Sequence, residues 1–95
     1  MRLLLNVVPD EFCFEYDNDE KILDLSHYKI INLTSLSSLI NLTDLNLTYN
    51  NIVDLTPLSS LINLTDLSLA NNQIIDLSPL SSLTNLINLD LSDNQ

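Results

Sequence analysis

The sequence restarts at a fixed interval. Residues 42–63 read LTDLNLTYNNIVDLTPLSSLIN and residues 64–85 read LTDLSLANNQIIDLSPLSSLTN, so most letters recur after 22 positions. The same frame continues forward into residues 86–94 and backward into residues 20–41. A chain that repeats in this way stacks one supersecondary unit on copies of itself, as a solenoid.

Each copy begins with an alternation of apolar and polar residues. In the second copy Leu45 and Leu47 alternate with Asp44, Asn46 and Thr48. Successive side chains of a strand point to opposite faces, so the leucines are predicted to point inward and the polar residues outward. Strands of successive copies then lie in register as a parallel β-sheet.

An asparagine recurs where each copy must bend away from the sheet. The residues are Asn50, Asn72 and Asn94, whereas the first copy has Tyr28. An amide offers both donors and an acceptor, so it can satisfy backbone groups that the bend buries. We therefore predict a structural asparagine ladder and a first copy that is looser or differently bent.

Beyond the bend, apolar residues return mostly at every third position, from Ile52 to Leu61 in the second copy. Three residues per turn suit a 3₁₀-helix. Thr56 followed by Pro57 predicts the helix start, with the hydroxyl as N-cap and proline at the first helical position. Asp54 and Asp76 precede two such segments, and we interpret them as structural because a carboxylate is favourable at a helix N-terminus.

These features resemble the leucine-rich-repeat family. The frame L-x-x-L-x-L-x-x-N with its 22-residue period is similar to the short class found in bacterial internalins and in a phosphatase regulatory subunit. The two central copies, NLTDLNLTYNNIVDLTPL and NLTDLSLANNQIIDLSPL, carry the closest signature. The resemblance implies an α/β-type solenoid with a curved parallel β-sheet on a concave face, 3₁₀ or single-turn helical segments on the convex face, and a protein-binding role.

The repeats occupy residues 20–95, as about three and a half copies, and residues 1–19 precede them. We predict that residues 1–19 form an N-terminal β cap, a hairpin that seals the open end of the first copy. A strand at residues 3–8 and a turn at residues 9–11 lead to a second strand with alternating aromatic residues at Phe12, Phe14 and Tyr16. An aromatic binding patch is the alternative.

The last copy is predicted to have no C-terminal cap. Leu86, Leu89 and Leu91 have no following copy to cover them, and the strand edge is bare. We favour the interpretation that the chain is a piece of a longer array. The alternative is that the uncapped end meets a partner, such as a second copy of the chain.

Composition and charge exclude several classes of function. The formal net charge is −10, with only three basic residues, which opposes binding to nucleic acid or to an anionic membrane. Glycine is absent, which argues against phosphate-cradling loops. With one cysteine, no secretory signal and no spanning segment recognised, we predict a cytoplasmic location, with a secreted effector as the alternative.

No catalytic, cofactor-binding or metal-binding constellation is recognised. His27 has no counterpart in the other copies, and Cys13 has no basic neighbour that would lower its pKa. The polar residues 17–20, three of them acidic, lack the ligand order of a calcium loop, so they are interpreted as a solvated turn. We predict a protein that is not an enzyme and carries neither cofactor nor metal.

The outward ladders of the sheet are the patterned surface that remains. Asp44 and Asp66 should be lateral neighbours whose repulsion a basic partner would remove. Tyr49 is the best single hot-spot candidate, because it is an aromatic residue at the sheet rim. The predicted partner-binding residues are Asp44, Asn46, Thr48, Tyr49, Asp66, Ser68, Asn71, Asn88 and Asp90.

We therefore predict a non-catalytic protein-interaction module that binds a protein with a basic surface on its acidic concave sheet. A hydrated sheet face without a ligand is one alternative. The other is a structural spacer or fragment of a larger leucine-rich-repeat protein whose function lies elsewhere.

Overall fold

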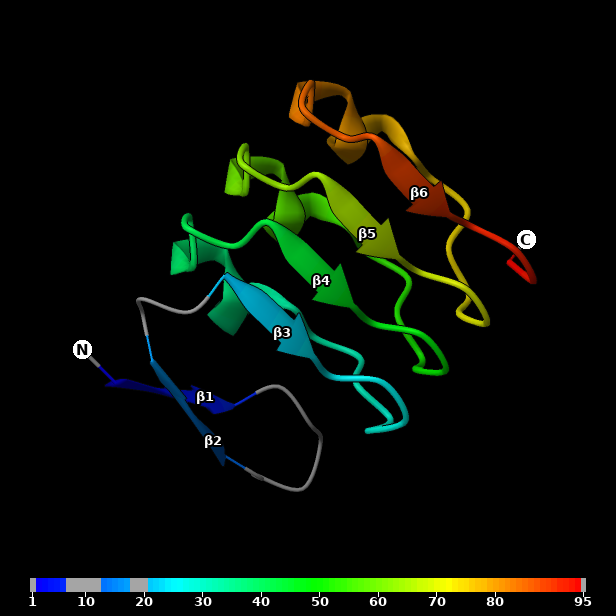
Figure 1. The fold of residues 1–95 in the computed structure, drawn as a ribbon. Helices are drawn as coiled ribbons and strands as arrows, with labels where there is room; N and C mark the ends of the chain where they lie inside the picture. Colours follow the sequence, from blue (N-terminus) through cyan, green and yellow to red (C-terminus); the bar gives the residue numbers. More distant parts are fainter. Residues whose placement is uncertain (1, 7–12, 18–20, 95) are drawn as a thin grey trace.

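The computed structural model describes residues 2–6, 13–17 and 21–94 (Figure 1). Within these residues, two short strands form an antiparallel pair, four strands form a parallel sheet in chain order, and three 3₁₀-helices alternate with the strands of that sheet. The elements are β1 (Arg2–Asn6), β2 (Cys13–Asp17), β3 (Ile22–Asp24), η1 (Thr34–Ser38), β4 (Asp44–Asn46), η2 (Thr56–Ser60), β5 (Asp66–Ser68), η3 (Ser78–Ser82) and β6 (Asn88–Asp90).

The four strands of the parallel sheet lie in the register that the 22-residue period predicts. Leu45 pairs with Leu23 on one side and with Leu67 on the other, and Leu67 pairs in turn with Leu89. The lateral hydrogen bonds continue past the strands, since the N–H of Tyr49 donates to the carbonyl of Ala70 at 3.0 Å. The predicted leucine-rich-repeat solenoid is therefore confirmed.

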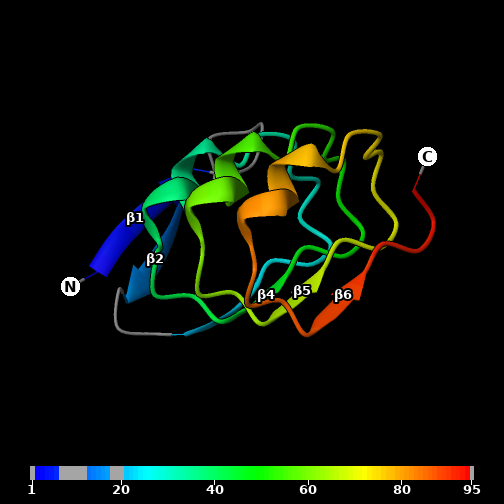
Figure 2. The same cartoon turned by 90° about the horizontal axis from the view of Figure 1, so that it is seen from above.

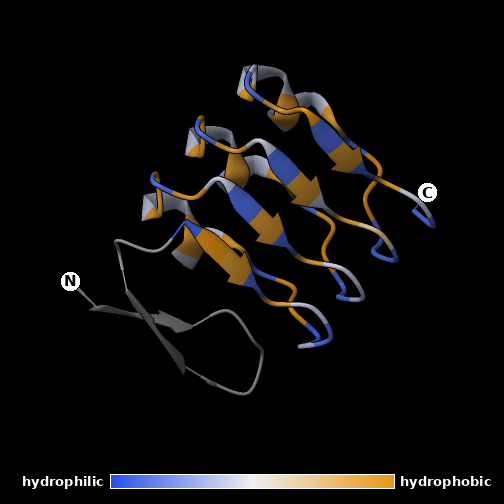
Figure 3. Ribbon diagram, viewed as in Figure 1, coloured by the Kyte–Doolittle hydropathy of each residue, from blue (hydrophilic) through white to orange (hydrophobic). Residues whose placement is uncertain are grey.

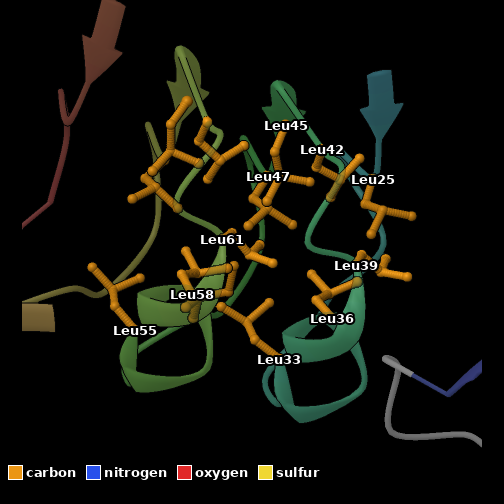
Figure 4. Packing of buried hydrophobic residues seen from close by; sticks show 14 of the residues in the cluster. Leu25, Leu33, Leu36, Leu39, Leu42, Leu45, Leu47, Leu55, Leu58 and Leu61 are labelled. Carbon is orange, nitrogen blue, oxygen red and sulfur yellow. The ribbon is translucent and has the colours of Figure 1, made fainter. Parts of the chain in front are cut away.

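The strands lie on one side of the solenoid and the 3₁₀-helices on the other (Figure 2). Leucines from both sides fill the space between them, as Figure 4 shows for two neighbouring copies. Leu47, Leu58 and Leu61 have no exposed surface. Burying each leucine contributes about 1.5–3 kcal/mol, so each copy is stabilised mainly by its neighbours.

The 3₁₀-helices begin one residue earlier than predicted. Leu55 is the N-cap of η2, and no side chain donates or accepts a hydrogen bond from that position. Instead, Asp54 Oδ1 accepts the N–H of Thr56 at 2.9 Å, and Asp76 Oδ1 accepts the N–H of Ser78 at 2.9 Å. The predicted hydroxyl cap is wrong, because an aspartate side chain reaches the N–H two residues further along the chain.

The first copy bends differently from the others. Lys29 has a positive φ of 59°, whereas the equivalent residues Asn51 and Gln73 do not have positive φ. His27 and Tyr49 also have positive φ, of 64° and 59°, at a position where all four copies share this left-handed conformation. Non-glycine residues seldom adopt this conformation, so the second left-handed residue marks the first bend as distinct.

The two ends of the solenoid differ. Next to the first copy, β1 pairs with β2 from Arg2↔Asp17 to Asn6↔Cys13, and β1 lies close to η1 (Figure 2). The turn at 9–11, Phe12 and the boundary of the predicted cap at 19–20 lie outside the described residues, so the sealing role of the hairpin stays a prediction. At the other end Leu89 is 42% exposed, whereas its equivalent Leu67 is 2% exposed.

Candidate functional site

An open depression of about 660 Å³ crosses all four strands of the parallel sheet. We call its surface the strand face. In Figure 3 the strands β4 to β6 begin with a hydrophilic residue and β3 begins with a hydrophobic one, because Ile22 stands where the other copies have Asp44, Asp66 and Asn88. The strand face is lined by Ile22, Leu23, Asp24, Asp44, Leu45, Asn46, Asp66, Leu67, Ser68, Ile87, Asn88, Leu89 and Asp90.

One row of outward side chains across the sheet, or ladder, consists of Asp24, Asn46, Ser68 and Asp90. Serines hold the carboxylates at its two ends. Asp24 Oδ1 accepts hydrogen bonds from the N–H and hydroxyl of Ser26, at 3.0 and 2.7 Å. Asp90 Oδ1 accepts the same pair from Ser92, at 3.0 and 2.8 Å. The backbone N–H of the serine is the main cause that lowers the pKa of each carboxyl below its ordinary value, and the hydroxyl adds to it.

Between Asp24 and Asp90, the ladder consists of the uncharged residues Asn46 and Ser68. Asn46 Oδ1 accepts hydrogen bonds from the N–H and hydroxyl of Thr48, at 3.0 and 2.6 Å. The Thr48 hydroxyl also shares a hydrogen bond of 2.7 Å with the hydroxyl of Ser68. These three predicted site residues therefore form one network across β4 and β5, which fixes their rotamers.

Asp44 and Asp66 are lateral neighbours in the sheet, as the period predicts. Their surroundings differ. Asp66 Oδ1 accepts a hydrogen bond of 2.6 Å from the side-chain amide of Asn88. No hydrogen bond between described residues reaches the carboxylate of Asp44, which is half-buried. Asp44 therefore keeps its full acceptor capacity for a donor from a ligand, whereas one oxygen of Asp66 already accepts the Asn88 amide.

Tyr49 lies beyond the strands, at the rim where the chain turns. Its ring stacks on His27 from the first copy, with ring centroids 4.6 Å apart and planes inclined by 15°. The side chain is 53% exposed. The equivalent residue Asn71 is half-buried, and its N–H donates to the carbonyl of Ser92 at 2.9 Å. Tyr49 and Asn71 are rim residues and do not line the depression.

The asparagine ladder lies behind the strand face, within the bend. Asn72 Nδ2 donates to the carbonyl oxygens of Leu47 and Leu69, both at 3.0 Å, and its Oδ1 accepts the N–H of Ile52 at 3.1 Å. Asn50 and Asn94 form equivalent bonds, of which one stays within their own copy and the others reach the copy before. Asn50 and Asn72 are only 7% and 8% exposed, so they hold neighbouring copies together and cannot contact a partner.

Sequence reasoning missed a second set of polar links between copies. Asn63 Nδ2 donates to the carbonyl of Ile40 at 2.8 Å, and Asn85 Nδ2 donates to that of Ile62 at 2.9 Å. The hydroxyls of Ser60 and Ser82 form similar bonds on the helical side. The signal was present in the recurrence of these residues after 22 positions.

Within residues 2–6, 13–17 and 21–94 no group of three or more histidine, cysteine, aspartate or glutamate side chains is placed to hold a metal ion. No helix in this part of the chain is long and apolar enough to cross a membrane.

Comparison with known proteins agrees with the geometry. Residues 62–95 match the family model for leucine-rich repeats (two copies). Internalin C2 from Listeria monocytogenes is similar in structure, with a TM-score of 0.80 and 42% identity over 82% of this chain and 34% of its own. The Listeria monocytogenes internalin InlF gives a TM-score of 0.69 and 36% identity over 70% of this chain and 20% of its own. No curated protein matches the sequence significantly.

The stacked strands, the 3₁₀-helices and the asparagine ladder define a leucine-rich-repeat solenoid, the class of fold used for protein interaction. The chain is a leucine-rich-repeat protein, and its repeats are internalin-like. It spans 34% and 20% of the two internalin structures, so what those longer proteins bind does not transfer to it directly.

Proposed function

We propose that this chain is a non-catalytic protein-interaction module that binds a basic segment of a partner protein across the strand face. The observation that supports this most is the state of Asp44. Its carboxylate lines an open depression, lies beside Asp66, and accepts no hydrogen bond from a described residue. A Lys or Arg side chain would supply the missing donor and remove the repulsion between the two carboxylates.

The rest of the strand face suits the same ligand. Serine donors lower the pKa of the Asp24 and Asp90 carboxyls, which favours their charged form. Lys21 and Lys29 are the basic residues among residues 21–94, and neither lines the depression. The exposed ring of Tyr49 at the rim could add a cation–π contact of about 0.5–1 kcal/mol to an arginine that reaches it.

Each of these contacts is weak alone, since an exposed ion pair is worth about 0.2–1 kcal/mol. Affinity must come from several of them made at once by a ligand that crosses the strands. An extended basic segment satisfies that requirement better than a single basic side chain.

Nuclear magnetic resonance titration of the labelled chain with a basic peptide tests the proposal. The probe is an octapeptide of alternating arginine and threonine with both ends blocked. We expect shifts along β3 to β6, and Asp44→Asn should weaken binding by at least threefold. Asp93→Asn is the matched control, because it removes one charge outside the depression at a left-handed position that asparagine tolerates. Equal losses from the two variants would show that only net charge matters.

A structural spacer or a fragment of a larger protein is the alternative to a binding module, and self-association through Leu86, Leu89 and Leu91 is the alternative use of the last copy. The cytoplasmic location also stays a prediction.

A further inference from the structure

A ridge of exposed aliphatic side chains runs along the flank of the solenoid, after the bend of each copy. It consists of Ile31, Val53 and Ile75, which are 54%, 45% and 67% exposed. We propose that this flank ridge binds a basic amphipathic helix of a partner protein. The site is separate from the strand face, because none of the three residues lines the depression.

The core does not need these three side chains. The residue before each of them points inward instead, and Ile30, Ile52 and Ile74 are at most 1% exposed. Thus each copy places one branched aliphatic residue in the core and the next one in water. Isolated apolar residues are normal on a protein surface, but a contiguous row of them on a rigid frame marks an interaction site.

The spacing of the ridge is fixed by the backbone. The N–H of Asn51 donates to the carbonyl of Ile30 at 2.8 Å, and the N–H of Gln73 donates to the carbonyl of Ile52 at 3.0 Å. These lateral bonds lie next to the ridge residues and are of the kind that joins adjacent strands. The copies therefore keep the strand spacing of about 4.8 Å here, and the ridge spans about 9.6 Å from the first residue to the third.

That spacing selects the kind of partner. A helix laid along the ridge presents one side chain per turn of about 5.4 Å, so three of them span about 10.8 Å. A strand laid the same way presents side chains on one face about 6.7 Å apart, and three of them span about 13.4 Å. The mismatch is about 1 Å for the helix and about 4 Å for the strand. Only the helix can contact all three ridge residues in succession.

Charge beside the ridge specifies the partner further. Asp54 and Asp76 directly follow Val53 and Ile75 in sequence, and both carboxylates are exposed. Each is held in place because its Oδ1 accepts a backbone N–H at 2.9 Å. Lys29 is the one basic residue close to the ridge in sequence, two positions before Ile31. A helix with basic residues along one side of its apolar stripe complements this pattern.

The probe is a blocked 14-residue peptide with leucine once per turn and lysine along one side of that stripe. We expect it to shift the methyl resonances of the ridge residues. The variant Ile31→Thr/Val53→Thr/Ile75→Thr keeps branched side chains and should weaken binding at least tenfold. Ile40→Thr/Ile62→Thr is the matched control, because these residues are 52% and 53% exposed before the strands, and it should change binding less than twofold.

Two further experiments distinguish the contribution of helical shape to binding from that of charge. A peptide of the same composition with leucines at every second position should bind at least fivefold more weakly than the helical one. Asp54→Asn/Asp76→Asn should reduce the salt dependence of binding, and it preserves the local fold because Asn32 Oδ1 already accepts the Thr34 N–H at 2.9 Å in the first copy.

Three results would overturn the proposal: no binding of the helical peptide, equal binding of the two peptides, or shifts confined to the strand face. Asp44→Asn should leave the helical peptide unaffected, so failure at the ridge and failure at the strand face can be told apart.

Discussion

The interior bend and the strand face lie only a few residues apart in each copy, yet they behave differently along the solenoid. At the bend Asn50 and Asn72 are the same residue, almost equally buried, and their amides donate to equivalent carbonyls, although Asn50 Oδ1 also accepts the N–H of Tyr28 in the distinct first bend. On the strand face the ladder that contains Asp44 and Asp66 changes from isoleucine to aspartate to asparagine. A position that contacts the next copy must match it, whereas a position that contacts solvent is free to differ.

Removing an asparagine side chain from the bend should produce the largest loss of stability. Asn72→Ala leaves the buried N–H of Ile52 without its partner, and it removes one of the two amide donors to each of the carbonyls of Leu47 and Leu69, which Asn50 and Asn94 still reach. An unsatisfied buried group costs about 1–3 kcal/mol and each lost hydrogen bond adds about 0.5–1.5 kcal/mol, so we expect the free energy of unfolding to fall by about 2 kcal/mol or more. Urea unfolding monitored by circular dichroism measures it, and a loss below about 1 kcal/mol would contradict the structural role of the ladder.

Gln73→Ala is the control for that variant. Gln73 is exposed and adjacent, and the bond it forms between copies uses its backbone N–H, which alanine retains. The expected change is within about 0.5 kcal/mol.

This contrast explains what could be predicted from the sequence. Residues that contact the next copy of the repeat recur at a fixed period, so the sequence alone places Leu45, Leu67 and Asn72 in register. The first residue of each 3₁₀-helix was harder to predict. Thr56 and Asp54 are both good capping residues, and only the backbone geometry shows that Asp54 Oδ1 is the one that accepts the N–H.

The strand face was predictable in position but not in chemistry. The period places Asp44 beside Asp66, but it does not show that Asn88 donates to Asp66 and leaves Asp44 without a donor. Side-chain rotamers decide that difference, and rotamers depend on contacts between copies. The flank ridge was not predicted, for another reason. Val53 directly follows a buried isoleucine, and a hydrophobic period of about three residues does not show which of two adjacent aliphatic residues is buried and which is exposed.

Lowering the pH should have an intermediate effect on stability, through exposed aspartates that recur from copy to copy. Hydrogen bonds from Thr56, the side chain first, lower the pKa of Asp54, and those from Ser78, the backbone first, lower the pKa of Asp76. The folded state therefore releases these protons more readily than the unfolded state. The stability they contribute is complete above the ordinary carboxyl pKa of about 4 and is lost as the pH falls through the lowered values.

Asp54→Asn/Asp76→Asn keeps an acceptor at both places and removes the titration. Urea midpoints at about pH 5.5 and about pH 3 should then differ less for the variant than for the parent chain. Equal losses in the two proteins would assign the acid sensitivity to other carboxylates, such as Asp24 and Asp90, whose pKa values are also lowered.

The smallest effect on stability is expected on the strand face. Asp44→Asn removes one of two adjacent like charges and breaks no hydrogen bond between described residues, so the free energy of unfolding should rise or stay within about 0.5 kcal/mol. Asp66→Asn removes the same charge but weakens the bond from Asn88, so it should be the less stable variant. If Asp44→Asn were instead as destabilising as Asn72→Ala, Asp44 would belong to the structural set, and its carboxylate could not be reserved for a ligand.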